Sequence, residues 1–127
     1  MKGAIQNLIL VIAALALAYY SAIPAQVFYC ANIGTCTGGF FGFDLGILIW
    51  MMVIYSFCST ALLTIFGGRN KYWWVAAAIT PAFLFQITID LYHTYLLIIW
   101  IPIAWGLGIF VHKTLTKFAP SLIANIK

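Results

Sequence analysis

The sequence predicts an all-α integral membrane protein, a bundle of four transmembrane helices with both termini on the cytoplasmic side. Three observations predict this fold class. Of 127 residues, 65% are hydrophobic and 6% are charged, too few polar side chains to cover a water-soluble domain. Four uncharged apolar stretches each have the length needed to cross about 30 Å of hydrocarbon as a helix. The charged residues between these stretches alternate in kind from one side of the predicted membrane to the other.

The four predicted spans form a single transmembrane domain over residues 1–127. They run over about residues 4–23, 45–66, 72–89 and 95–111. We expect the first span to end before Pro24, because proline interrupts a helix, and an outer segment to follow over 24–44. A continuous helix from 72 to 111 would be about 60 Å long, twice the core thickness, so we expect a tight hairpin there. A three-span protein, with the last two spans merged or the first peripheral, is the alternative.

Charge placement gives the orientation. With these spans, every Lys and Arg falls on one side of the membrane and every acidic residue on the other. The cations are Lys2, Arg69, Lys71, Lys113, Lys117 and Lys127, and the opposite side carries Asp44, Asp90 and His93. Cytoplasmic loops of membrane proteins carry this excess of positive charge. We therefore expect a multi-pass protein of the plasma (cytoplasmic) membrane with both termini in the cytoplasm.

Glycine recurs at every fourth position ahead of the second span, at Gly34, Gly38, Gly42 and Gly46. Glycines at this spacing line one face of a helix and let another helix approach closely in lipid. One interpretation is a loop up to about Gly39, followed by a helix that exposes Gly42 and Gly46. The other is a longer helix that uses all four glycines. Both make Gly42 and Gly46 candidates for helix packing, against this chain or another.

Three cysteines invite a chemical interpretation. Cys30 and Cys36 share the predicted outer segment, where an extracytoplasmic environment would allow a disulfide between them. Free thiols or a redox role are the alternatives, although the spacing is not Cys-x-x-Cys. Cys58 lies inside the second span, where a reduced cysteine usually packs as a small hydrophobic residue.

A second polar candidate lies at the turn between the third and fourth spans. Asp90 and His93 are three residues apart, and Gln86 lies one helical turn deeper, so the three side chains form a candidate polar, proton-carrying or metal site. The competing interpretation is a solvated turn. His112 is expected about 25 Å away on the other side of the membrane, so we predict no metal site within one chain. No nucleophile, base and orienting acid occur together, and we predict no catalytic residues and no cofactor.

Pro81 and Pro102 lie near the middles of the third and fourth spans and predict helix kinks. The spans contain almost no ionisable residue, which argues against proton-coupled transport.

Three classes of function follow, of which the third is the weakest. The first is a small non-catalytic subunit that packs through its glycine groove and aromatic faces into a larger or self-assembled membrane complex, such as a membrane oxidoreductase or a secretion assembly. The second is a homo-oligomeric channel for a neutral or anionic solute. The third is a membrane enzyme subunit whose metal or redox site is shared across an interface. The expected partners are the lipid bilayer and other membrane subunits or copies of the chain, with no nucleic acid. A row of polar side chains through the full depth of the assembled protein would favour the channel. Uninterrupted apolar faces would favour the subunit.

Overall fold

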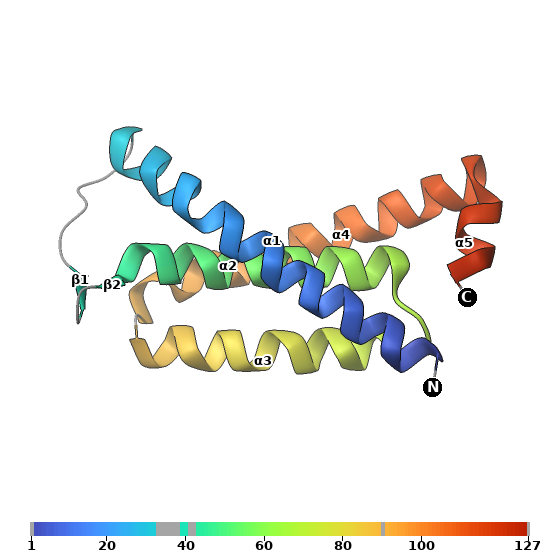
Figure 1. Cartoon of the computed structure of the whole chain (residues 1–127), viewed down its shortest axis with the longest axis horizontal. Coiled ribbons are helices and arrows are strands. Elements are labelled where there is room, and N and C mark those ends of the chain that lie inside the picture. The colour runs from blue at the N-terminus through green and yellow to red at the C-terminus, as the bar shows by residue number, and fades with distance from the viewer. Residues whose placement is uncertain (1, 33–38, 41–42, 90, 127) are drawn as a thin grey trace.

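The computed structural model describes residues 2–32, 39–40, 43–89 and 91–126, and these residues are almost all helical (Figure 1). The long helices are α1 (Lys2–Asn32), α2 (Leu45–Phe66), α3 (Lys71–Ile89) and α4 (Thr94–Phe118). The short elements are the antiparallel pair β1 (Gly39–Phe40) and β2 (Phe43–Asp44), the 3₁₀ turn η1 (Leu91–His93), and α5 (Pro120–Ile126). All four long helices are long and apolar enough to cross a membrane, which confirms the predicted set of helices.

The first helix corrects the expected boundary at Pro24. α1 continues through this proline to Asn32, so residues 24–32 of the expected outer segment are helical. The Pro24 side chain is exposed, whereas Ala22 and Gln26 on either side of it are buried. The buried face of α1 therefore runs on past the proline, and transmembrane helices tolerate proline when neighbouring groups replace the lost backbone bond.

α2 is the central helix of the bundle. It contacts α1, α3 and α4, whereas α3 and α4 contact each other far less. In Figure 1, α1 crosses α2 at an angle and α4 diverges toward its carboxyl end. The bundle is consequently organised as three helices around one.

Small residues spaced by four line the buried faces of the outer helices. They are Ala14, Ala18 and Ala22 on α1, Ala78 and Ala82 on α3, and Ala104 and Gly108 on α4. A Cβ atom added at Gly108 would lie 2.7 Å from the Cβ of Thr64, so α4 rests directly on α2 there. Small residues allow this close approach between membrane helices, where no hydrophobic force drives association.

The predicted glycine groove lies mostly outside the described residues. Gly34, Gly38 and Gly42 are not described, and Gly46 is the second residue of α2. Residues 43 and 44 form strand β2, so the helix that both interpretations expected there begins only at Leu45. A packing role for Gly46 stays a prediction.

Both central prolines lie within regular helix. Pro81 is inside α3 and Pro102 inside α4, and both side chains are exposed. Each helix continues on both sides of its proline, and the expected kinks stay predictions.

Candidate functional site

The carboxyl end of α2 is a polar junction that joins all four long helices. The last four carbonyls of a helix have no partner within it, and in lipid each unpaired group is costly. Here each accepts a hydrogen bond. Leu63 O accepts from the Gly67 amide at 2.9 Å, Thr64 O from Lys71 Nζ at 3.0 Å and Ile65 O from His112 Nδ1 at 2.9 Å. Phe66 O accepts from Gln6 Nε2. We call this set the α2 junction.

Asn7 of α1 clamps the turn that follows α2. Its Nδ2 donates to Arg69 O at 3.2 Å, and its Oδ1 accepts from the Gly68 amide at 2.9 Å. Asn7 is fully buried. A Cβ at Gly68 would come within 3.0 Å of the Gly3 Cα, so the turn needs glycine to meet α1 this closely. Asn70 has φ 62°, a left-handed conformation that asparagine tolerates well.

The bond from His112 identifies its tautomer. A carbonyl oxygen only accepts, so the hydrogen bond to Ile65 O requires the proton on Nδ1. His112 and Lys71 thus place donors at the negative end of the α2 dipole, where they are most favourable. η1, which contains His93, directly precedes α4, whereas His112 lies near the carboxyl end of α4.

The predicted site at Gln86, Asp90 and His93 is only partly described. Gln86 is buried in α3, with 1% of its surface exposed. Asp90 lies outside the described residues, and for His93 only the backbone, in η1, is described. Within the described part of the chain, no three His, Cys, Asp or Glu side chains come together as metal ligands would. A polar or proton-carrying role at this turn stays a prediction.

The candidate disulfide also falls beyond what is described. Cys36 is not described, and Cys30 is placed by its backbone alone, in the last turns of α1. Cys58 is a half-buried free thiol on α2.

Buried hydroxyl groups line the carboxyl half of α2. Ser56, Ser59, Thr60 and Thr64 are each at most 1% exposed. Three of them donate to the preceding turn of their own helix. Ser59 Oγ and Thr60 Oγ1 donate to Ser56 O at 3.2 and 2.7 Å, and Thr64 Oγ1 donates to Thr60 O at 2.6 Å. Among the described residues, Ser56 Oγ has no hydrogen-bond partner. Because three of these hydroxyl groups donate to the backbone of their own helix, the four side chains pack as a small-residue surface. We call this row of side chains the hydroxyl stripe.

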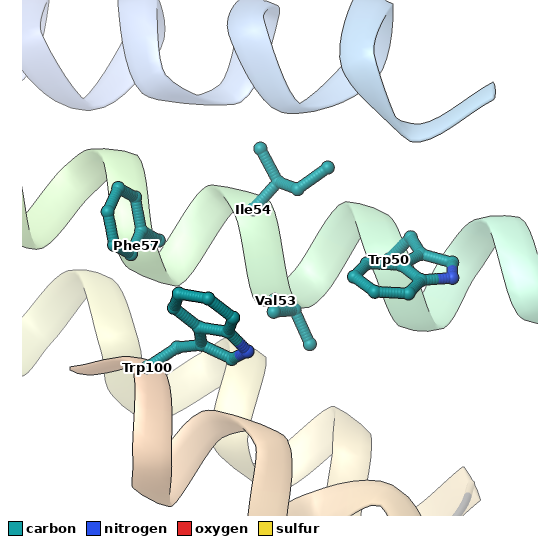
Figure 2. Close-up of a pocket in the computed structure, with 5 residues that line it drawn as sticks. All are labelled: Trp50, Val53, Ile54, Phe57 and Trp100. Atoms are coloured by element: carbon teal, nitrogen blue, oxygen red, sulfur yellow. The ribbon is translucent and has the colours of Figure 1, made fainter. Parts of the chain in front are cut away.

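An apolar groove lies between α2 and α4, mainly along the amino half of α2 (Figure 2). It has a volume of about 210 Å³ and is lined by Trp50, Val53, Ile54, Phe57 and Trp100. The Phe57 and Trp100 rings meet edge to face, with centroids 5.9 Å apart. Trp100 is 39% exposed, Trp50, Ile54 and Phe57 are partly exposed, and Val53 is buried. We call this set the Trp100 groove.

The groove and the junction were not predicted as sites. The sequence contains one signal for the groove, the aromatic residues Trp50 and Phe57 seven positions apart on one helical face. No protein-family model, curated protein or solved structure matches this chain.

Proposed function

We propose that this chain is a non-catalytic subunit of a membrane complex, larger or self-assembled, and that a helix of another subunit or another copy fills the Trp100 groove. The observation that carries the proposal is the exposure of the central helix. α2 contacts the three other long helices, yet its amino half retains an indented aromatic surface. Trp side chains in such pockets frequently dominate the binding energy of protein interfaces.

We propose a topology with both termini in the cytoplasm and with α3 and α4 as a tight hairpin through η1. The start of α1, the turn between α2 and α3, and the carboxyl end of α4 lie at one end of the bundle in Figure 1. These segments carry Arg69, Lys71, Lys113 and Lys117, and such an excess of cations marks the cytoplasmic side.

The buried hydroxyls favour a subunit over a channel. A water-filled path needs side-chain donors and acceptors that face the solute. Ser59, Thr60 and Thr64 instead donate to the α2 backbone, and Val53 interrupts the stripe toward the amino end.

The same proposal includes a second contact at Gly46, the predicted packing glycine that lies on α2. Leucine at Gly46 would fill this contact and weaken assembly.

The test is the mass of the native particle, extracted in mild detergent and read by native mass spectrometry. We expect a fixed complex, either of this chain with other chains or of several copies of the 14.1 kDa chain. Trp100→Ala should release the chain from that complex. Trp105→Ala is the matched control, because Trp105 lies on the same helix, is 48% exposed and does not line the groove. A particle that contains one copy and no other protein would contradict the proposal.

A further inference from the structure

The carboxyl end of α4 turns sharply into a short helix at the cationic end of the bundle. Pro120 has no amide hydrogen and is the first residue of α5, so the α4 hydrogen-bond ladder stops just before it. The corner is held by the Ala119 amide, which donates to Leu115 O at 2.7 Å, and the Leu122 amide, which donates to Ala119 O at 3.1 Å. Figure 1 shows α5 running at an angle to α4.

The corner carries cationic and apolar side chains next to each other. Lys113 and Lys117 are exposed on the last turns of α4, and Lys117 Nζ lies 5.7 Å from the centroid of the Phe118 ring. Phe118 is 77% exposed and Leu122 is 48% exposed, whereas Ile123 is buried. Basic residues beside exposed apolar ones are typical of segments that lie in the membrane interface. We call Lys113, Lys117 and α5 with Phe118 the α4 foot.

Acidic residues are scarce in this chain, and the one that the structure describes lies far from the foot (Figure 1). The chain contains two acidic residues, Asp44 and Asp90, against six Lys and Arg. Asp44 is the last residue of β2, which Figure 1 places at the opposite end of the bundle, and Asp90 lies outside the described residues. Among the described residues, no carboxylate side chain lies at the α4 foot, so its lysines can pair with negative charge from outside the chain.

The foot lies at the depth of lipid headgroups. α4 has 25 residues and is about 37 Å long, more than the roughly 30 Å hydrocarbon core, so its cationic last turns extend past the core. At the same end of the bundle, Tyr72 and Trp73 at the start of α3 are 56% and 78% exposed. Tyr and Trp concentrate at this level of a membrane.

We propose that the α4 foot binds anionic phospholipid headgroups, with Lys113 and Lys117 on the phosphates and Phe118 and Leu122 in the upper acyl region. Arg69, exposed on the turn after α2, adds a cation to the same leaflet. The surface charge of an anionic leaflet attracts each nearby lysine or arginine. The proposal rests on the membrane span and not on the subunit role, so the purified chain alone tests it.

The test is lipid competition on the full chain. The chain in nonionic detergent is offered equal amounts of phosphatidylglycerol and phosphatidylcholine, and bound lipids are counted by native mass spectrometry. We expect a preference for phosphatidylglycerol that falls about 5-fold for each lysine removed in Lys113→Gln and in the double variant Lys113→Gln/Lys117→Gln. The Lys113→Arg/Lys117→Arg variant keeps the charge and should keep the preference.

A second measurement examines α5 itself without any substitution. Hydrogen exchange over residues 120–126 should be slower in phosphatidylglycerol nanodiscs than in phosphatidylcholine nanodiscs, and the difference should shrink as salt rises from about 20 to 500 mM. Equal binding of the two lipids by the native chain would overturn the proposal. An unchanged preference in the double glutamine variant with native helix content would also overturn it. So would hydrogen exchange in α5 at the same rate in both kinds of nanodisc.

Discussion

The two halves of α2 differ in chemistry and in how completely the chain covers them. The carboxyl half buries Ser56, Ser59, Thr60 and Thr64, and its terminal carbonyls accept bonds from three other helices and a turn. The amino half presents Trp50 and Ile54, with Phe57 just past the midpoint, at a groove that Trp100 partly closes. The comparison indicates that one half of the helix holds the chain together, while the other remains available to a partner.

The largest effect is expected where α4 rests on the carboxyl half of α2. Gly108→Leu places a side chain where even a Cβ would lie 2.7 Å from Thr64 Cβ, so we expect a loss of about 1–3 kcal/mol in the free energy of unfolding in detergent. Gly106→Leu is the matched control, since a Cβ at Gly106 meets nothing within 4 Å. The control should be neutral or stabilising, because leucine favours helix over glycine by up to about 1 kcal/mol. Equal unfolding of both variants would show that α4 is not seated on α2 through this glycine.

The clamp at the α2 junction should give the next largest effect. Asn7→Leu leaves the Gly68 amide and Arg69 O without their partner, and each buried unpaired group costs about 1–3 kcal/mol. Water at the bundle end will recover part of this loss, so we expect about 1–2 kcal/mol of destabilisation by chemical unfolding. Leu8→Ala, at a 48% exposed neighbouring position, serves as the control and should cost less. A larger loss from Leu8→Ala than from Asn7→Leu would contradict the clamp.

The smallest effect is expected in the hydroxyl stripe, at Ser56. Ser56 Oγ has no hydrogen-bond partner among the described residues, so Ser56→Ala removes a buried hydroxyl without breaking a bond. We expect the free energy of unfolding to change by less than about 0.5 kcal/mol, or to rise slightly. The thermal unfolding midpoint of the variant checks this. A large decrease would mean that the Ser56 hydroxyl has a polar partner and that the stripe is more than a packing surface.

Most of the secondary structure was predictable, because the length and hydropathy of each apolar stretch are enough to identify a membrane-spanning helix. The predicted span 45–66 coincides with α2, and 72–89 differs from α3 by one residue. α4 runs on from residue 111 to Phe118, since a helix continues into water with polar side chains after its apolar stretch has ended. α1 passes Pro24 because its buried face continues to Gln26.

The packing surfaces were less predictable. The glycine spacing predicted close packing at residues 34–46, whereas the described contacts use alanines at the same spacing, as at Ala14 and Ala18, and a glycine elsewhere, Gly108. That pattern is present in the sequence but is ambiguous, because alanine is common in any apolar helix. The α2 junction joins residues as far apart as Gln6 and Phe66, and no local pattern indicates that such groups meet. The Trp100 groove likewise needs the placement of α4 against α2.

Photo-crosslinking in native membranes tests directly whether a partner helix fills the Trp100 groove. A photo-crosslinking amino acid is placed at Ile54, in the groove, or at Leu84, which is 59% exposed on α3. If a partner helix fills the groove, irradiation at position 54 gives one discrete crosslinked protein, another subunit or a second copy of this chain, identified by mass spectrometry. Position 84 then gives lipid adducts in the same membranes. Lipid adducts alone at both positions would contradict the claim, because the exposed half of α2 would then face only the bilayer.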